Sequence, residues 1–135
     1  MADNLEFEKS FEYNTTESGI VIPIGLSLLG VSTRFDAKID TGSQFCIFRR
    51  KHAELLGLDV ETGMPLRMMT ATGHFDTFGH TVDLTFLGLM TTSTVYFAAE
   101  DSFYLNILGR QGWLDRVKLG LIDYEGKLLL SSYGE

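Results

Sequence analysis

The sequence predicts a mainly β protein, a small closed β-barrel with one or two short helices. Glycine is frequent, with 14 residues, whereas proline occurs only twice. β-Branched and aromatic residues are spread along the whole chain, and the apolar runs are short and separated by turn residues. These features are typical of strands joined by tight turns rather than of a helical bundle. A length of 135 residues is enough for one domain with its own hydrophobic core.

Two apolar runs in the first third of the chain predict a β-hairpin. Ile20 to Leu28 is apolar almost throughout, and Gly30 follows it as a turn residue. In the next run, Val31 to Ile39, every second residue from Phe35 onward is apolar. This alternation indicates a strand with one buried face, so the two runs are expected to pair around Gly30.

A short helix and three further strands are expected in the middle of the chain. Phe45 to Phe48 is a short apolar run, and Arg50 to Leu56 has the length of a two-turn helix that Gly57 would end. Strands are also expected at Leu66–Met69 and Thr81–Leu87. The residues between these two strands are polar and contain glycine, which predicts a long, exposed hairpin.

The last third of the chain continues the pattern of short elements. Its two final strands surround Glu125-Gly126, which predicts another hairpin. The expected elements are strands at Thr91–Ala99, Asn106–Gly109, Leu119–Ile122 and Leu128–Ser131, and a brief helix at Gln111–Arg116 that carries Trp113 on the core.

The first 18 residues differ from the rest of the chain in charge. Five acidic side chains and only one basic side chain, Lys9, give this segment a local charge of −4. The segment shows no strong hydrophobic period. We therefore expect residues 1–18 to form an acidic flexible arm or a weakly held edge strand, and residues 19–135 to form the folded domain.

Charge and composition exclude several classes of partner. Eighteen acidic and eleven basic side chains give a net charge of −7, which repels nucleic acid and gives no attraction to anionic lipid. No apolar run approaches the length of a membrane span, and the N-terminal residues lack the apolar centre of a signal peptide. Cys46 is the only cysteine and cannot form an internal disulfide. We therefore expect a cytoplasmic protein without nucleic-acid or membrane partners.

An aspartate in a glycine-containing loop is the sharpest functional feature of the sequence. Asp40-Thr41-Gly42-Ser43 follows one apolar strand and precedes another. Gly42 allows a close turn, and the hydroxyls of Thr41 and Ser43 could fix the orientation of the Asp40 carboxylate. The alternative is an ordinary Asx turn, because Asp and Gly begin many turns.

A second motif favours the catalytic interpretation. Asn106-Ile107-Leu108-Gly109-Arg110 lies downstream and is followed by Gly112-Trp113-Leu114. Together with Asp40-Thr41-Gly42-Ser43, this motif resembles the retropepsins, the aspartic proteases that include the retroviral enzymes. The order of the expected elements is also similar: hairpin, catalytic loop, flap, apolar-apolar-Gly strand, short helix and terminal strand. The resemblance covers approximately Gly19 to the C-terminus and implies the retropepsin (acid protease) type of barrel.

The resemblance implies a role for each matching residue. Ser43 would donate a hydrogen bond to the outer oxygen of the Asp40 carboxylate, and Thr41 would grip the backbone across the floor of a dimer. Arg110 would begin the short helix and hold backbone carbonyls or a carboxylate. The implied groups are the catalytic Asp40; the supporting Thr41, Gly42 and Ser43; Thr72, Gly73 and His74 near the tip of a substrate-binding flap; and Ile107, Leu108, Gly109 and Arg110 behind the site.

The chain departs from the retroviral pattern at two places. Gln44 stands where the retroviral enzymes have an acidic partner for the helix arginine, so Arg110 needs another partner. The expected flap tip, Thr70 to Phe75, contains only Gly73 in place of a glycine-rich sequence. The flap's substrate contacts are therefore expected to differ.

A single Asp40 loop is half of an aspartic protease site. Peptide hydrolysis by this chemistry needs two carboxylates that share one proton: one activates a water, and the other donates to the scissile carbonyl. The resemblance implies a homodimer with two copies of Asp40, an extended peptide or protein substrate, and no metal or cofactor. Leu128–Leu130 is expected as a further dimer contact, paired with its mate or with the N-terminal arm. The alternatives are a non-catalytic dimeric peptide-binding module and a domain that only dimerises a larger assembly.

A thiol protease or a metal site would need a different set of residues. Cys46 with His52, His74 or His80 is the candidate set. Cys46 lies between two apolar residues and is expected to be a buried core thiol. His74 and His80 are expected as exposed polar residues of the flap, and no second pair of ligands completes a zinc pattern.

Overall fold

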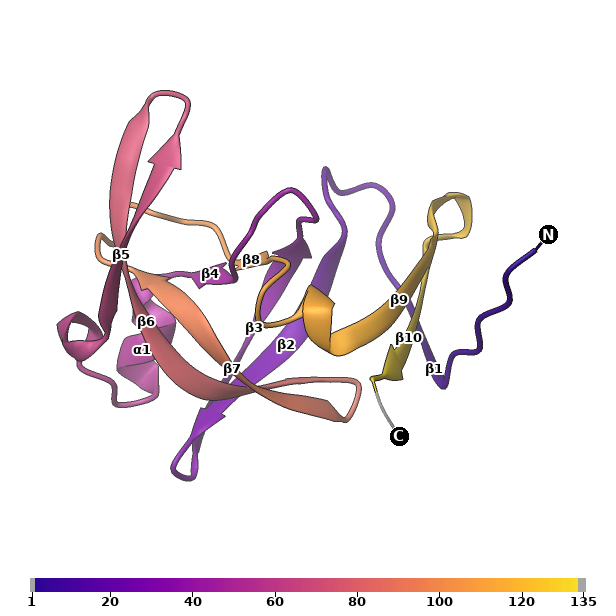
Figure 1. Ribbon diagram of the computed structural model, residues 1–135, viewed down its shortest axis with the longest axis horizontal. Helices are drawn as coiled ribbons and strands as arrows, with labels where there is room; N and C mark the ends of the chain where they lie inside the picture. Colours follow the sequence, from indigo (N-terminus) through magenta and orange to yellow (C-terminus); the bar gives the residue numbers. More distant parts are fainter. Residues whose placement is uncertain (1, 134–135) are drawn as a thin grey trace.

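The computed structural model describes residues 2–133. The first residue of the expected arm and the last two residues of the expected domain therefore lie outside the described residues. The protein is mainly β, as predicted, and carries one short α-helix within this range (Figure 1). The elements are β1 (Lys9–Glu12), β2 (Val21–Leu28), β3 (Val31–Ile39), β4 (Ile47–Phe48), α1 (Arg50–Leu55), β5 (Met64–Thr70), β6 (Gly73–Phe86), β7 (Leu89–Ala98), β8 (Ile107–Leu108), β9 (Val117–Ile122) and β10 (Lys127–Ser132).

The predicted hairpin of β2 and β3 is confirmed. Leu28 pairs with Val31, and Gly30 makes the turn with a φ of +84°, a conformation that glycine adopts without strain. Alternate residues of β2 are buried, and Ala37 and Ile39 are buried at the end of β3. The intervening positions of β3 are exposed, so this strand presents one face to the core and one to solvent.

Seven strands form one sheet in the order β2-β3-β8-β4-β7-β6-β5. β2 also pairs with β6 through Gly25–Ser27, so the path of pairings returns to its first strand. β8 pairs with β3 in parallel and with β4 in antiparallel orientation. β8, which follows the predicted flap in the chain, thus lies between β3 and β4, the two strands that flank the Asp40 loop.

β5 and β6 form the long hairpin that stands away from the body of the protein in Figure 1. The long, exposed hairpin was predicted correctly, and its strands extend beyond the expected Leu66–Met69 and Thr81–Leu87. Thr70 pairs with Gly73, which leaves only Ala71-Thr72 as the turn. Cross-strand partners explain why polar residues remain in the ladder: Arg67 Nε donates to Asp76 Oδ1 at 2.9 Å across the hairpin.

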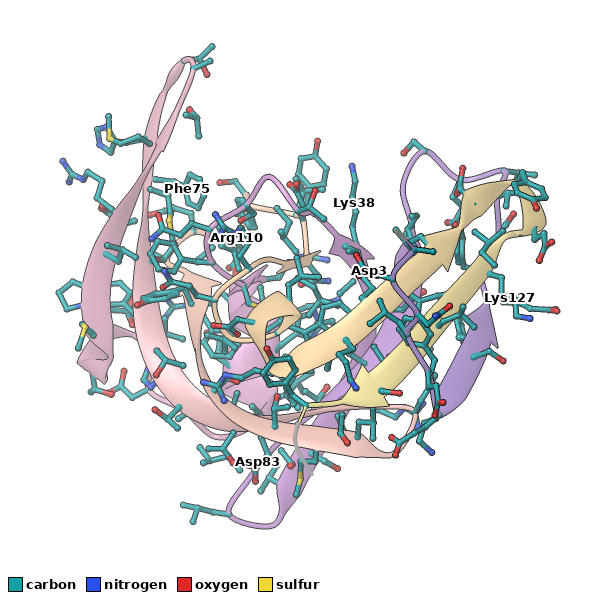
Figure 2. The ribbon with its side chains drawn as sticks, turned by 45° about the vertical axis from the view of Figure 1, so that its right-hand side comes forward. Asp3, Lys38, Phe75, Asp83, Arg110 and Lys127 are labelled. Atoms are coloured by element: carbon teal, nitrogen blue, oxygen red, sulfur yellow. The ribbon has the colours of Figure 1, made fainter. Side chains whose placement is uncertain are left out.

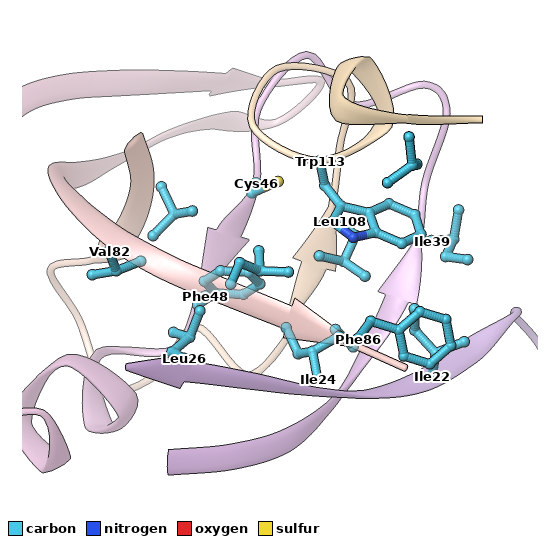
Figure 3. Close-up of a cluster of buried hydrophobic side chains, with 14 of the residues drawn as sticks. Ile22, Ile24, Leu26, Ile39, Cys46, Phe48, Val82, Phe86, Leu108 and Trp113 are labelled. Atoms are coloured by element: carbon cyan, nitrogen blue, oxygen red, sulfur yellow. The ribbon is translucent and has the colours of Figure 1, made fainter. Parts of the chain in front are cut away.

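The core lies between the sheet and the segments around the Asp40 loop (Figure 3). β2 contributes one face of alternating residues, and Trp113 closes the core next to Phe86, with ring centroids 6.4 Å apart. The central buried side chains are Ile22, Ile24, Leu26, Phe48, Val82, Phe86, Phe97, Leu108 and Trp113. Trp113 therefore packs on the core as predicted.

The chain ends form a second sheet in the order β1-β10-β9. β1, from the acidic arm, is an edge strand paired with β10 of the same chain. β10 is paired on both sides, and Leu128 and Leu130 are buried. Of the two partners expected for Leu128–Leu130, the N-terminal arm is the one found, because β1 of the same chain pairs with this segment.

The brief helix expected at Gln111–Arg116 is shorter than predicted. Gly112 adopts a φ of +106°, which is incompatible with a right-handed helix. Only Leu114–Arg116 form a helical turn, of the 3-10 type. Asp115 Oδ1 accepts a hydrogen bond from the Gly112 main-chain N–H at 3.0 Å, which stabilises this irregular approach.

Helix α1 follows the sequence prediction closely. It ends at Leu55 with Leu56 as the C-cap, and Gly57 follows with a φ of +83°.

Within residues 2–133 no helix is long and apolar enough to cross a bilayer.

Candidate active site

The Asp40 loop begins where β3 leaves the sheet. The Asp40 main-chain N–H donates to the Leu108 carbonyl at 2.9 Å, so the ladder with β8 continues one residue past the strand. Asp40 Oδ1 accepts the Gly42 N–H at 2.9 Å, and the Ser43 N–H donates to the Asp40 carbonyl at 3.1 Å. The loop is thus an Asx turn that also holds a half-buried carboxylate at the surface. The Asx turn and the loop that presents a candidate catalytic carboxylate, which the sequence left as alternatives, are therefore compatible.

β8 and the residues after it support the loop from behind. The Arg110 N–H donates to the Ser43 carbonyl at 2.9 Å, and the Gln111 N–H donates to the Gln44 carbonyl at 2.7 Å. A Cβ on Gly109 would clash with the Phe45 carbonyl and lie 2.8 Å from the Ser43 carbonyl oxygen. Glycine is therefore required at this position because two backbone segments meet there.

Ser43 does not hold the Asp40 carboxylate in this structure. Its Oγ donates to the Phe45 carbonyl at 2.8 Å. A hydroxyl has a single proton to donate, so the bond expected for the outer carboxylate oxygen of Asp40 is not made. The hydroxyl stabilises the exit of the loop instead.

Arg110 also differs from the expected role. Its main chain supports the loop, but within residues 2–133 its exposed guanidinium makes no hydrogen bond or ion pair. Gln44 stands in place of an acidic residue, and no carboxylate among the described residues lies within ion-pair distance of the guanidinium. Arg110 lines an open recess of about 600 Å³ beside the loop, together with Thr41, Gly42, Gln44, Gln111 and Asp115.

A groove of about 550 Å³ opens between the Asp40 loop and the β5–β6 hairpin. We call it the flap groove. Asp40 is the only carboxylate among its lining residues, and Arg67 is the only cation. Its lining residues are Asp40, Gly42, Ser43, Gln44, Phe45, Ile47, Leu66, Arg67, Met68, Met69, Thr70, Phe75, Phe103, Leu105 and Ile107.

The residues expected at the flap tip do not line the flap groove. Thr72, Gly73 and His74 lie at the turn of the hairpin and are exposed. The hairpin instead contributes residues 66–70 and Phe75, which Figure 2 labels. Phe103, from the loop before β8, stacks on Phe75 with ring centroids 4.8 Å apart.

Phe75, Phe103 and Leu105 are functional candidates that sequence reasoning missed. The apolar run Phe103-Tyr104-Leu105 directly before the Asn106 motif was the available signal, because its alternate residues point into the groove. Phe75 was hidden in a stretch that appeared polar.

The thiol and imidazole groups lie apart from this site. Cys46 is fully buried as predicted, and burial raises the pKa of its thiol to about 11. His80 is half-buried rather than exposed as expected. Its Nε2 lies 2.9 Å from the Val60 carbonyl oxygen. His74 is exposed as predicted. Within residues 2–133 no group of three His, Cys, Asp or Glu side chains is arranged to hold a metal ion.

A barrel of this topology with an Asp-Thr-Gly loop on an open groove defines the aspartic protease class. The family model for aspartyl proteases matches residues 26–122, more than half of the chain, and the chain belongs to this family. Among solved structures, a retropepsin-like aspartic protease from Rickettsia conorii is similar over 91% of this chain and 97% of that chain, with a TM-score of 0.65 and 19% identity. The fold is therefore retropepsin-like. No curated protein sequence matches the chain.

Proposed function

We propose that two copies of this chain form a two-fold dimer that hydrolyses internal peptide bonds in extended substrates. The two Asp40 carboxylates share one proton across the axis. The ionised carboxylate removes a proton from a water, which attacks the scissile carbonyl carbon, while the protonated carboxyl donates to the carbonyl oxygen. The resulting tetrahedral species then breaks its C–N bond: the leaving amine takes the proton that the first carboxylate removed from water, and the second carboxylate recovers its proton from the former carbonyl oxygen.

The observation that carries this proposal is the single carboxylate in the flap groove. Asp40 is held at the groove by its bond from the Gly42 N–H, and among residues 2–133 no other acidic side chain lines the groove. The mechanism needs one ionised and one protonated carboxyl group at the same time, and a single chain presents only Asp40 at the groove. A second copy would supply the other carboxyl group.

The β5 strand supports an extended substrate. β5 is the last strand in the sheet order, so one of its edges has no strand partner among the described residues. Leu66 to Thr70 of this strand line the groove. An extended peptide can bind along such an edge through main-chain hydrogen bonds, while its side chains enter the groove.

The proposal is tested by activity and molecular mass measured across the same dilution series. Specific activity on unstructured protein should rise with enzyme concentration in step with the dimer fraction. Asp40→Asn should abolish cleavage but keep the fold. Asp59→Asn is the matched control and should leave activity unchanged, because Asp59 is exposed and does not line the flap groove. Excess Asp40→Asn chains should suppress wild-type activity beyond dilution, because mixed dimers lack one acid.

Two outcomes would contradict the proposal. A monomeric population that cleaves at the full rate per chain would show that the site is not shared. A dimer that binds peptides in the flap groove but does not cleave them at any pH would identify a non-catalytic peptide-binding module.

A further inference from the structure

Lys38 and Asp40 lie on the same face of β3 and its continuation. The Lys38 N–H donates to the Asn106 carbonyl and the Asp40 N–H to the Leu108 carbonyl, both at 2.9 Å. Lys38 and Asp40 thus bond to the same neighbouring strand. Because side chains alternate between the two faces of a strand, residues two apart share a face. Ile39, between them, is buried on the opposite face. The lysine therefore stands next to the proposed catalytic carboxylate.

Gly19 leaves the space that the Lys38 side chain occupies. Val21 pairs with Lys38, and the Ile39 N–H donates to the Ile20 carbonyl at 2.9 Å, so the register places Gly19 across from Asp40. A Cβ on Gly19 would lie 2.6 Å from Lys38 Cε and 2.9 Å from its Cδ. The lysine stem thus leans diagonally across Gly19, beside Asp40 rather than away from it.

The Lys38 ammonium has no ion-pair partner within residues 2–133. The ion pairs of this part of the chain involve Arg50, Arg67 and Arg116. Asp36 shares the exposed face of β3 two residues before Lys38 but is not paired with it. In Figure 2 the Lys38 side chain extends from the ribbon with its nitrogen outermost. A positive charge is therefore free to meet a ligand next to Asp40.

Lys38 is not among the residues that line the flap groove, and its stem lies over Gly19, on the β2 side of β3. Its register partner on β8, Ile107, lines the groove. Arg67, the cation inside the groove, is already paired with Asp76 at 2.9 Å. The charge of Arg67 is thus compensated within the described residues, whereas the charge of Lys38 is not.

We propose that Lys38 makes this protein select peptides with an acidic side chain next to the scissile bond. This inference rests on the proposed function, because Asp40 marks the bond that is cleaved. Successive residues of an extended peptide are about 3.3 Å apart, so a residue adjacent to the scissile bond lies within reach of a lysine placed beside Asp40. Opposite charges at an exposed site favour binding modestly, and a basic side chain at the same position would be repelled.

The test uses synthetic 12-residue peptides with randomised central positions, and it reads both binding and cleavage. Immobilised Asp40→Asn protein should retain a pool enriched in Asp and Glu, whether or not the wild type is a protease. For cleaved peptides, replacing Gln by Glu next to the cut should raise kcat/KM about two- to fivefold, the range of an exposed ion pair. Lys38→Met should abolish the preference and Lys38→Glu should invert it, whereas Lys38→Arg should retain it.

Two further variants separate a specific effect from a general change of charge. Lys51→Met removes an equal charge from the exposed surface of α1 and should leave the acidic preference intact. Gly19→Ala should weaken the preference with little loss of stability, because its Cβ displaces only a flexible lysine stem. The inference would be overturned if the wild-type and Lys38→Glu proteins retained acidic peptides equally. Cleavage with no preference for an acidic residue next to the cut would also overturn it. Retention that depends on Lys38 without any cleavage would uphold it while refuting the protease function.

Discussion

The rings of Phe75 and Phe103 stack with centroids 4.8 Å apart and planes inclined by 25°. This contact joins the flap strand β6 to the loop before β8, and both rings line the flap groove. An offset aromatic pair contributes about 0.5–1.5 kcal/mol beyond the burial of its surface. The stack therefore holds the flap strand β6 against the wall of the groove.

Phe103→Ala should weaken substrate binding more than it slows the chemical step. The expected result is a rise in KM of about tenfold, corresponding to about 1.4 kcal/mol, with a smaller change in kcat. Steady-state kinetics on one cleaved peptide measure both constants. Tyr104→Ala is the matched control, because Tyr104 is 74% exposed and does not line the groove. Equal effects of the two changes would show that the stack does not shape the groove.

Ser43→Ala should act on stability rather than on catalysis. The Ser43 hydroxyl donates to the Phe45 carbonyl, and the loss of such a bond costs about 1 kcal/mol of unfolding free energy. The pH dependence of kcat/KM should keep its shape, since the hydroxyl does not contact Asp40. Urea unfolding and a pH–rate profile give the two readouts. A shifted acidic limb would instead support the hydrogen bond to the carboxylate that the family resemblance implies.

Gly109→Ala should be severely destabilising. The new methyl group would meet the backbone carbonyl of Phe45, which cannot move without disturbing the Asp40 loop. Overpacking of this kind costs about 3 kcal/mol or more at a rigid position. Thermal unfolding should show a large drop in Tm, whereas Gly25→Ala, whose Cβ has only ordinary contacts at 3.8 Å and beyond, should be tolerated. Similar melting of both variants would contradict this steric explanation.

His52 should make the fold sensitive to acid. The ring is 4% exposed and stacks on Phe35 with ring centroids 3.7 Å apart, and neither ring nitrogen has a hydrogen-bond partner within residues 2–133. Burial, together with the cations of Lys51 and Arg49, lowers the pKa of His52 from 6.5 to about 4. Protonation would place an unpartnered charge in the core, so the folded state resists it.

The pKa of His52 fixes the direction of the effect. Because the unfolded chain takes up the proton near pH 6.5 and the folded chain only near pH 4, the contribution of neutral His52 is complete above pH 6.5. It should be lost as the pH falls toward 4, by up to about 3 kcal/mol. Urea unfolding at pH 7 and pH 4 should show a smaller loss for His52→Phe than for wild type. His74→Gln, at an exposed site, should behave like wild type.

Local patterns were sufficient to predict the elements whose stability depends on neighbouring residues. The β2–β3 hairpin followed from two apolar runs around Gly30, and helix α1 from its length and Gly57, because turns and helix ends depend on a few adjacent residues. The Asp40 loop could also be recognised, since a strand end, a carboxylate and a glycine are contiguous in the chain.

The sequence by itself thus determined the fold class, the first hairpin and the identity of the candidate carboxylate. The tertiary structure decided the direction of the Ser43 hydroxyl, the Phe75–Phe103 stack and the position of the Lys38 stem over Gly19. Each of these depends on which groups the fold brings within a few ångströms. A hydroxyl donates to whichever acceptor lies nearest, and a ring stacks on whichever ring the sheet places opposite it. The Phe75–Phe103 stack joins residues distant in the chain, and the Ser43 bond, although local, depends on how the fold orients the Phe45 carbonyl. Periodicity does not encode either of them.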